Sequence, residues 1–382
     1  MSFKKIGILG GGQLGRMMQE VAQQRNMPVW CLDKGHDYPA ALYRDYYVVG
    51  DILNYDDVMQ FGEDKDVITV EIEHVNLDAL KALQNNGKEV HPNPNALGII
   101  KNKNSQKKFY ADNKIPIPLF TAFQSKDDAI RVFPEWENRL PCIYKSAEMG
   151  YDGKGVRTIR NLQDVHELDD IAGAFEEKID IQLEVAVMIV RSTKGEHVIF
   201  PPVAMYFDED NHILSEVHFP CKISADQLDT MNEIAINVTK SLDICGLCAF
   251  EFFISTNGDV VLNEIAPRPH NSMHISMNNS ISSQFDQHLR AISGMPLGKP
   301  TMEKSGIMYN IIGRNEDYGD VNWDGWKQIL SLESVFVHLY GKTIIKPARK
   351  MGHINIVGSD FKEIQQKLVI VKENFKNKQN GE

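Results

Sequence analysis

The chain contains 382 residues, which is too long for one ordinary hydrophobic core, and this length predicts two or three domains. Hydrophobic residues make up 42% of the chain and charged residues 24%, which is the composition of a soluble globular protein. The formal net charge of −11 argues against a protein that binds nucleic acid or acidic membranes, because such proteins need a broad basic surface.

The beginning of the chain and its cysteines indicate the compartment. The first apolar stretch ends in glycine after a few residues and does not predict a secretory signal, and no stretch approaches the length of a membrane span. Five scattered cysteines predict reduced thiols and a cytoplasmic protein. Cys245 and Cys248 have the C-x-x-C spacing, but no second Cys or His pair stands at a zinc-like spacing, so we interpret them as small apolar residues.

Residues 1 to about 95 alternate strand-like and helix-like patterns. Apolar runs predict strands at residues 5–9, 28–32, 46–49 and 67–72, and apolar residues with helical spacing follow the first of these runs. This alternation predicts a Rossmann-like parallel sheet covered by helices.

The first turn of this sheet, Gly10 to Gly15, has the pattern G-x-G-x-x-G between a strand and a helix. Asp33 ends the next strand at the distance expected of a ribose-binding acid. Taken alone, these features predict a dinucleotide site and an NAD-dependent dehydrogenase. The same turn also suits any ligand that needs close backbone approach at a helix N-terminus, or a tight turn without a ligand.

Acidic residues follow the fourth predicted strand. Glu71 and Glu73 are two residues apart, so we expect both on one face of the strand. They lie at its carboxyl end, where open α/β sheets bind ligands. The alternative is that they only solvate an exposed rim.

A basic helix and a glycine-rich loop come next. Residues 96–114 predict a lysine-rich helix, and the prolines at 115–118 end it and indicate a linker. The strand at residues 140–145 ends in a lysine and leads to the loop at residues 150–155, which holds three glycines and another lysine. Glycines let backbone N–H groups approach phosphate oxygens, so this segment predicts a phosphate site. A surface hairpin is the alternative.

Residues 174–191 predict one edge-like strand followed by one apolar strand. A segment of this kind between two domains can present backbone amides to an adenine, while Glu177 or Glu184 takes the ribose hydroxyls. A core strand with capped ends is equally consistent with the pattern.

A hairpin is predicted around Asn257-Gly258, which lies between two apolar runs and is typical of a two-residue type I′ turn. This turn fixes the register of the two strands. In that register, Phe253 lies opposite Leu262. Two steps further from the turn, Glu251 lies opposite Glu264.

Two opposed carboxylates need compensation, because like charges directly across a strand pair destabilise a sheet. A divalent cation would provide it. Glu251, Glu264 and the amide oxygen of Asn263 are hard oxygen ligands of the kind that Mg²⁺ takes together with substrate phosphates. A protonated carboxyl pair or a slipped register is the alternative.

Cations follow the hairpin. Pro267 and Pro269 stiffen the backbone around Arg268, whose guanidinium group suits a small oxyanion such as bicarbonate or a carboxylate. His270 stands beside it, either as a further ligand or as a structural histidine. Residues 342–350 hold four cations in nine residues, which suits a phosphate monoester unless they form an exposed basic strand.

Six motifs together resemble those of the N5-carboxyaminoimidazole ribonucleotide synthetases, a family of ATP-grasp ligases in purine biosynthesis. They lie at residues 10–17, 69–75, 150–155, 263–272, 283–288 and 349–353. The resemblance runs from residue 5 to about 355 and implies an α/β and α+β fold of three domains. These are a Rossmann-like domain at residues 1–100, a small lid domain at 101–183 with the glycine-rich loop, and a large domain at 184–382 with the magnesium site.

The resemblance also implies a reaction. ATP, bicarbonate and 5-aminoimidazole ribonucleotide (AIR) would give ADP, phosphate and N5-carboxyaminoimidazole ribonucleotide through carboxyphosphate, in a cytoplasmic homodimer that needs Mg²⁺. The glycine turn would then serve AIR rather than NAD. Another ATP-grasp ligase, such as a formate-dependent glycinamide ribonucleotide transformylase, is the nearest alternative. A dehydrogenase and a non-catalytic nucleotide-binding protein are more distant alternatives.

The same resemblance implies which residues form each site. Contacts to ATP are expected from Lys103, Lys145, Gly150, Tyr151, Asp152, Gly153, Lys154, Gly155, Val156, Glu176, Glu177, Lys178, Ile179, Glu184, His212, Asn263 and Glu264. Mg²⁺ would bind Glu251, Asn263 and Glu264. AIR would contact Gln13, Leu14, Glu73, Tyr151, Asp152, Lys342, Arg349 and Lys350. The catalytic residues would be Asp152 as general base, Lys342, and the bicarbonate ligands Arg268, His270 and Asn271. Lys103 stands where the family usually has Arg, so it keeps the charge but loses bidentate geometry.

Overall fold

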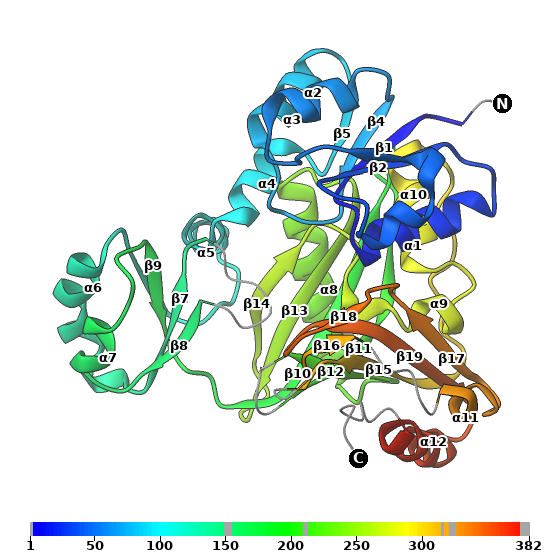
Figure 1. The fold of residues 1–382 in the computed structure, drawn as a ribbon. Helices are drawn as coiled ribbons and strands as arrows, with labels where there is room; N and C mark the ends of the chain where they lie inside the picture. The colour runs from blue at the N-terminus through cyan, green and yellow to red at the C-terminus, as the bar shows by residue number, and fades with distance from the viewer. Residues whose placement is uncertain (1–2, 149–154, 209–212, 315–316, 321–325, 375–382) are drawn as a thin grey trace.

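The structure, a computed structural model, describes residues 3–148, 155–208, 213–314, 317–320 and 326–374. Figure 1 shows an N-terminal domain, a small lobe and a large body that also contains the C-terminal strands. The described residues form a five-stranded parallel sheet and antiparallel sheets of eight, four and two strands, which confirms the predicted mixture of α/β and α+β structure.

The N-terminal domain is a five-stranded parallel sheet in the order β3-β2-β1-β4-β5, which confirms the predicted Rossmann-like sheet. The central strands are fully buried because helices cover both faces of the sheet. The strands are β1 (Ile6–Leu9), β2 (Val29–Asp33), β3 (Tyr47–Val49), β4 (Val67–Val70) and β5 (Glu89–His91). The helices are α1 (Gln13–Gln23), η1 (Pro39–Leu42), η2 (Arg44–Tyr46), α2 (Tyr55–Gly62), α3 (Leu77–Asn85) and α4 (Pro94–Lys101).

The fourth strand is shorter than predicted. It ends at Val70, so Glu71 and Glu73 lie beyond the strand and do not share one of its faces. The expectation of a common face was therefore wrong. The two carboxylates instead reach different partners, in the glycine turn and in the large body respectively.

The small lobe is a four-stranded sheet in the order β6-β9-β7-β8. The predicted basic helix is split in two, because Asn102 ends the first helix and caps the second through the backbone N–H of Ser105. The strand predicted as edge-like is an interior strand with four buried residues. The elements are α5 (Lys103–Asp112), β6 (Phe120–Phe123), α6 (Lys126–Val132), η3 (Phe133–Arg139), β7 (Cys142–Ser146), β8 (Val156–Ile159), α7 (Leu162–His166) and β9 (Gly173–Glu176).

The large body is one eight-stranded antiparallel sheet in the order β14-β13-β10-β11-β12-β15-β19-β17. Its first strand in chain order, β10, begins at Ile181, three residues before the predicted start of the large domain at residue 184. The strands are β10 (Ile181–Arg191), β11 (His197–Phe207), β12 (Leu214–Phe219), β13 (Gly246–Ser255), β14 (Val260–Ala266), β15 (Ser305–Ile312), β17 (Val335–Leu339) and β19 (Lys350–Gly358), with β16 (Gly319–Asp320) and β18 (Ile344–Ile345) paired separately. The helices are α8 (Ala225–Ser241), η4 (Asn271–Met273), α9 (Ser276–Asn279), α10 (Gln284–Ser293), α11 (Trp326–Leu330) and α12 (Phe361–Asn374).

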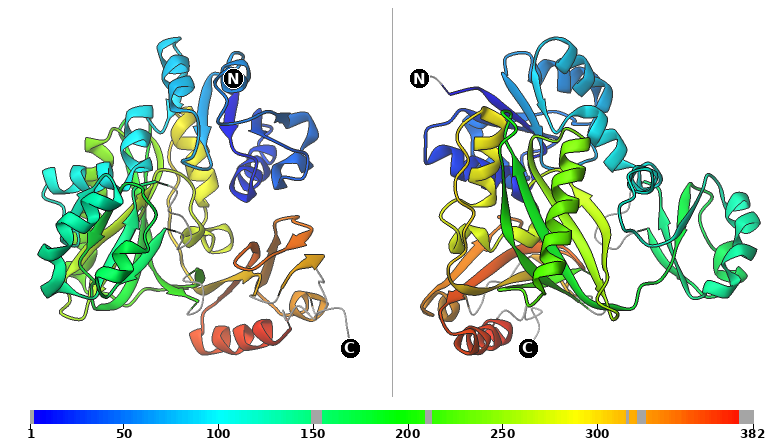
Figure 2. Two further views of the ribbon diagram at one scale, coloured as in Figure 1. Left: turned by 60° about the vertical axis from the view of Figure 1, so that its left-hand side comes forward. Right: turned by 180° about the vertical axis from the view of Figure 1, so that it is seen from behind.

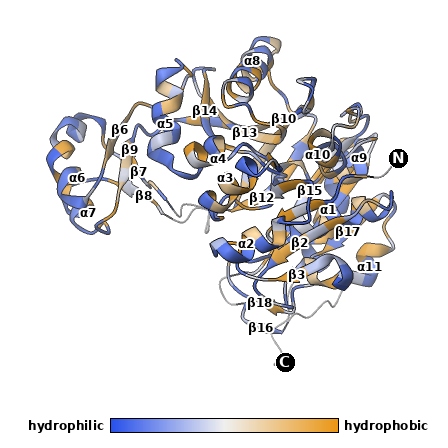
Figure 3. Ribbon diagram, turned by 90° about the horizontal axis from the view of Figure 1, so that it is seen from above, coloured by the Kyte–Doolittle hydropathy of each residue, from blue (hydrophilic) through white to orange (hydrophobic). Residues whose placement is uncertain are grey.

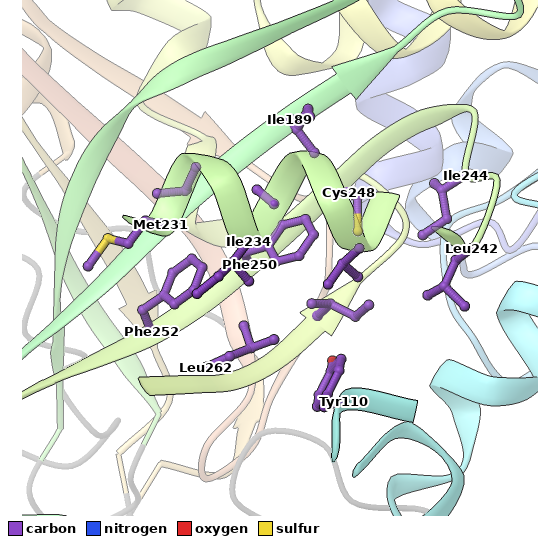
Figure 4. Packing of buried hydrophobic residues seen from close by; sticks show 14 of the residues in the cluster. Tyr110, Ile189, Met231, Ile234, Leu242, Ile244, Cys248, Phe250, Phe252 and Leu262 are labelled. Atoms are coloured by element: carbon purple, nitrogen blue, oxygen red, sulfur yellow. The ribbon is translucent and has the colours of Figure 1, made fainter. Parts of the chain in front are cut away.

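The largest core lies between α8 and strands β10, β13 and β14. Phe250 and Phe252 alternate along β13 with residues that face the other side of the sheet, and both pack beneath α8 with Leu262 of β14 (Figure 4). Cys248 belongs to this core, as expected for a small apolar residue, whereas Cys245 is half-buried near the carbonyl of Ser192. Figure 3 shows the same division, with hydrophobic strands inside and many hydrophilic residues on outer helices such as α6.

Helix α10 connects the N-terminal sheet to the large sheet (Figure 2). The imidazole of His288 lies between them, with Nε2 2.9 Å from the Thr69 hydroxyl of β4. Its Nδ1 accepts the backbone N–H of Leu247 at the start of β13. Asp286 of the same helix pairs with Arg25 beyond α1. Within the described residues, no helix combines the length and apolar content needed to cross a bilayer.

Candidate active site

The hairpin that carries the two predicted metal ligands has a longer turn than expected. The backbone N–H of Gly258 donates to the carbonyl of Ser255, and the N–H of Ser255 donates to the carbonyl of Asp259. Gly258 has φ +88, so the loop is a three-residue turn with glycine in the left-handed position rather than a type I′ turn. The predicted pairing of Phe253 with Leu262 was therefore wrong by one residue.

A β-bulge corrects the register further from the turn. Phe252 pairs with Leu262, but Glu251 pairs with Glu264, which leaves Asn263 as the extra residue. The predicted pairing of the two acids is therefore confirmed, although two errors of one residue cancel to give it. The bulge also explains why two consecutive residues serve the site: Leu262 and Ile265 pack into the core, while Asn263 and Glu264 between them contact lysines.

Two lysines from the small lobe meet this end of the hairpin. Lys103, the first residue of α5, forms an ion pair with Glu264. Lys145 of β7 donates to the amide oxygen of Asn263 at 2.8 Å. Burial opposes the ionisation of Glu264, but the ammonium groups of these lysines outweigh it and lower its pKa. Burial, together with the charge of Glu264, raises the pKa of Glu251.

The donor set fits Mg²⁺ that arrives with phosphate ligands. Among the residues that the structure describes, no group of three or more His, Cys, Asp or Glu side chains could hold a metal ion. A pair of carboxylates with one amide oxygen matches the sites in which Mg²⁺ takes one or two protein carboxylates and completes its shell with substrate phosphates and water. Glu251 and Glu264, with Asn263, are therefore chemically suitable.

The predicted nucleotide residues of β9 and β10 differ in their surroundings. Glu176 is buried, and its carboxylate lies 3.3 Å from the ammonium group of Lys145 and 3.0 Å from that of Lys107. Glu177 lies at the surface near Arg139. Burial raises the pKa of Glu184 to about 7, and the charge of Glu264 adds to this. The sequence reasoning missed Lys107, although its position four residues after Lys103 places both on one face of a helix.

Of the two basic residues after the hairpin, His270 contacts the acid pair and Arg268 contacts the N-terminal domain. Arg268 donates from Nε to Glu73 at 2.8 Å, so the two predicted site residues from different domains meet. Nε2 of His270 lies 3.5 Å from Glu251. The backbone N–H of Ser272 donates to Nδ1 of His270 at 3.3 Å, which assigns the ring proton of the neutral imidazole to Nε2.

Asn271 is arranged differently from its two neighbours. Its side chain is buried, and both ends of its amide group pair with the amide of Asn310, at 3.1 and 2.5 Å. Asn310 also donates to the carbonyl of Leu214. The amide of Asn271 is therefore held by the neighbouring strands of the large sheet.

The glycine turn is closed by the protein's own carboxylates. Asp33 accepts the backbone N–H of Gly11 at 2.8 Å. Glu71 accepts the N–H groups of Gly12 and Gly15, each at 2.7 Å. The donors that would bind a dinucleotide pyrophosphate are thus already occupied, and the interpretation of this turn as an NAD site was wrong.

The predicted AIR residues converge only in part. Lys342 donates to Gln13 at 3.1 Å and to the carbonyl of Lys350 at 2.8 Å, which brings the C-terminal segment onto the start of α1. Leu14 is buried in the N-terminal core beside Gln13. Arg349 instead donates to the carbonyl of Ile344 and stays at the surface.

The remaining predicted ATP residues are only partly described by the structure. Gly150, Tyr151, Asp152, Gly153, Lys154 and His212 lie outside the described residues. Gly155 has φ +74 and accepts the backbone N–H of Ser146, and the exposed Val156 begins β8. Lys178 and Ile179 lie in the connection between β9 and β10.

Three family models match successive parts of the chain. They describe a ribonucleotide synthetase preATP-grasp domain at residues 3–101, an ATP-grasp domain at residues 108–285 and a phosphoribosylaminoimidazole carboxylase C-terminal domain at residues 306–367. The chloroplastic phosphoribosylaminoimidazole carboxylase of Vigna aconitifolia is 34% identical over 96% of this chain. The chain spans 66% of the length of that relative.

Solved structures match over their whole length. The N5-carboxyaminoimidazole ribonucleotide synthetase of Thermotoga maritima is 34% identical, with a TM-score of 0.87 over 97% of this chain and 98% of that one. The N5-carboxyaminoimidazole synthase of Aspergillus clavatus, in complex with ADP and AIR, is 29% identical, with a TM-score of 0.86 over 97% of this chain and 99% of that one. From the site geometry and these matches together, the chain belongs to the N5-carboxyaminoimidazole ribonucleotide synthase family of ATP-grasp proteins.

Proposed function

We propose that the chain uses ATP to join bicarbonate to the amino group of AIR, giving ADP, phosphate and N5-carboxyaminoimidazole ribonucleotide. The observation that carries this proposal is the meeting of three charge groups at one hairpin end. In the acid pair, Glu264 forms an ion pair with Lys103 of the small lobe, and Glu251 lies beside His270 of the segment that also carries Arg268. The relative that binds ADP and AIR supports both nucleotide ligands.

For the ATP site, we infer that Lys103 and Lys145 contact the phosphates. Glu251, Asn263 and Glu264 would hold Mg²⁺, which would supply charge neutralisation of the phosphoryl oxygens. Lys145 is already aimed at this place by its contact with Asn263. The remaining expected contacts, from residues 150–156, the segment 176–179, Glu184 and His212, are part of the same proposal.

For the bicarbonate site, Arg268 offers a cationic fork and His270 an N–H donor next to the acid pair. A bicarbonate oxygen would attack the γ-phosphorus of ATP as the bond to ADP breaks, which gives carboxyphosphate. The charge that develops on the phosphoryl oxygens meets lysines fixed in advance, and this preorganisation lowers the barrier. Asn271 would act by holding the segment in place through Asn310.

In the second step, the amino nitrogen of AIR attacks the carboxyl carbon of carboxyphosphate and phosphate leaves. The amine proton must pass to a base, and we propose Asp152 for this role. Gln13, Lys342 and Lys350 would hold AIR, since they already meet between α1 and the C-terminal segment. Glu73, Tyr151 and Arg349 complete the expected AIR contacts.

An assay of ADP release tests the proposal. With MgATP and bicarbonate we expect release to rise strongly when AIR is added, with N5-carboxyaminoimidazole ribonucleotide as product. Parallel reactions with glycinamide ribonucleotide and formate test the nearest alternative ligase. Faster turnover with formate than with bicarbonate would replace the proposed function by that of a transformylase.

We also propose that the protein works as a cytoplasmic homodimer. The five free cysteines support a reducing compartment. Sedimentation equilibrium would give a mass near twice 43.3 kDa for a dimer. A mass of one chain at assay concentrations would contradict the dimer.

A further inference from the structure

The motif at residues 283–288 has no role in the steps above, yet its Gln284 lies directly behind His270. Gln284 is the first residue of α10 and is completely buried. Its Oε1 accepts the backbone N–H of His270 at 2.8 Å, and its Nε2 donates to the carbonyl of His270 at 2.9 Å. The second N–H of the same amide reaches Nδ1 of His274 at 2.9 Å. The backbone of His270 is therefore held at both polar groups by one side chain.

Gln284 is itself fixed on several sides. Its backbone N–H donates to the hydroxyl of Ser276 of α9 at 3.0 Å, and the preceding residue, Ser283, caps the helix. Its side-chain oxygen and both side-chain hydrogens have partners. A side chain with all its polar groups satisfied in a buried place has one accessible orientation, and it passes this rigidity to the residue it holds.

The imidazole of His270 depends on this hold. Ser272 fixes the ring tautomer by donating to Nδ1, but the direction in which Nε2 points depends on the backbone of His270. That backbone sits in a short non-helical segment between β14 and η4, which has no ladder of strand hydrogen bonds to define it. The two hydrogen bonds from the side chain of Gln284 hold this backbone instead.

The hold also connects His270 to the domain that carries the proposed AIR residues. One turn further along α10, His288 contacts Thr69 of β4. Asp286 pairs with Arg25, just beyond α1. The same helix thus fixes the position of His270 and its own position against the N-terminal sheet.

We propose that Gln284 is a positioning residue for the carboxylation reaction: it sets the angle at which Nε2 of His270 meets bicarbonate beside Glu251. This inference rests on the proposed function, because it takes bicarbonate as the ligand of His270. Gln284 itself contacts neither substrate, and it acts through the backbone of His270.

The same helix contains a matched control. Gln287 is also completely buried, and its amide group holds the backbone of Gly298 in the same way, accepting the N–H at 3.1 Å and donating to the carbonyl at 2.7 Å. Gly298 lies in the connection between α10 and β15, which contains none of the predicted site residues. The two glutamines therefore share their helix, their burial and their two bonds to one backbone residue. They differ in the residue they hold and in the additional contact of Gln284 with His274.

The experiment compares Gln284→Leu with Gln287→Leu. For Gln284→Leu we expect kcat/KM for bicarbonate to fall about 10²-fold, because displacement of a substrate-positioning group by about 1 Å has effects of that size. The KM for ATP should stay within about twofold of the unsubstituted protein, since the lysines and the acid pair are untouched. Gln287→Leu should lower the thermal midpoint by a similar amount but leave kcat/KM for bicarbonate nearly unchanged.

Two further measurements cover the remaining outcomes. Gln284→Glu keeps the acceptor for the His270 N–H and the side-chain shape, so it should fold and lie between the other two in kcat/KM for bicarbonate. Nitrogen-15 NMR of labelled histidine reports the His270 ring directly, and its Nδ1 and Nε2 signals should shift in the Gln284 variants but not in Gln287→Leu. Equal losses in the Leu pair, or unchanged His270 signals in Gln284→Glu, would overturn the inference. Failure of the proposed function is separate, because it shows as absent bicarbonate-dependent ADP release in the unsubstituted protein.

Discussion

Two carboxylates meet at the glycine turn of the N-terminal sheet, and two meet at the hairpin end of the large sheet. The two places differ in the partners of these carboxylates. In the turn, Asp33 and Glu71 receive three backbone N–H groups of the glycines. At the hairpin, Glu251 and Glu264 face each other across the ladder. The comparison shows that the protein's own carboxylates can occupy the donors of a glycine pattern typical of phosphate sites. At the proposed site, by contrast, lysine ammonium groups that could also contact a phosphate meet the acid pair.

The largest effect is expected from the hairpin. Glu251→Gln should reduce kcat by about 10²-fold or more, because one charge of the proposed magnesium site is lost. The thermal midpoint should stay the same or rise, since a like charge is removed from the pair. The matched control is Asp259→Asn, an exposed acid at the turn of the same hairpin, which should leave both quantities unchanged. Loss of stability without loss of activity in Glu251→Gln would contradict the comparison.

At the glycine turn, by contrast, the loss of a carboxylate should lower the stability of the protein. Glu71→Gln places an amide N–H against the N–H groups of Gly12 and Gly15, so at least one of them loses its acceptor. We expect the free energy of unfolding to fall by about 1–3 kcal/mol, measured by urea denaturation. Asp78→Asn, at a carboxylate that is 85% exposed in the same domain, should change it little. An equally stable Glu71→Gln protein would show that the turn does not depend on its internal carboxylate.

The stability of the protein should also depend on pH through Glu184, a carboxyl group that interacts with Glu264 of the acid pair. Burial raises its pKa to about 7, above the unfolded value near 4.5, so the folded state binds its proton more tightly. Its contribution to stability is therefore complete below about pH 4.5 and is lost as pH rises toward 7. Glu184→Gln should remove this loss and be more stable than the unsubstituted protein at pH 8, by about 1 kcal/mol, but not at pH 4.5. Unfolding curves of both proteins at the two pH values check this. The prediction is wrong if their difference in the free energy of unfolding is the same at pH 8 and at pH 4.5.

The smallest expected effect concerns NADH, which we expect not to bind. Because the N–H groups of the turn are already occupied, NADH fluorescence should not change when the protein is titrated, whereas a fluorescent ATP analogue with Mg²⁺ should bind. Saturable enhancement of NADH fluorescence would restore the dinucleotide interpretation.

Local patterns predicted much of this molecule. The apolar runs of the N-terminal sheet and the G-x-G-x-x-G turn were found from spacing alone, because both depend on neighbours in the chain. The pairing of Glu251 with Glu264 was also predicted, but the turn length and the bulge at Asn263 were not. A bulge is a feature of two paired strands, and the pattern of either strand alone does not show where the extra residue falls.

Contacts between distant residues were beyond the sequence patterns. The pairs Asn271 with Asn310 and Gln284 with His270 join polar residues of types that are usually exposed, and only the packed fold shows that they are buried. The partner of Glu71 was likewise hidden, since the length of β4 decides whether it reaches the turn. Patterns therefore indicated the acid pair Glu251 and Glu264, but they indicated neither Lys107 nor the buried polar contact of Gln284 with His270.

The continuous eight-stranded sheet has a practical consequence for dividing this chain. Strand β12 of the ATP-grasp region pairs along its length with β15 of the C-terminal region. A fragment that stops at residue 285 would leave Glu216–Phe219 as an open edge, with backbone groups ready to pair with another molecule. We therefore expect such a fragment to aggregate, and the C-terminal strands to be required for a folded nucleotide-binding region.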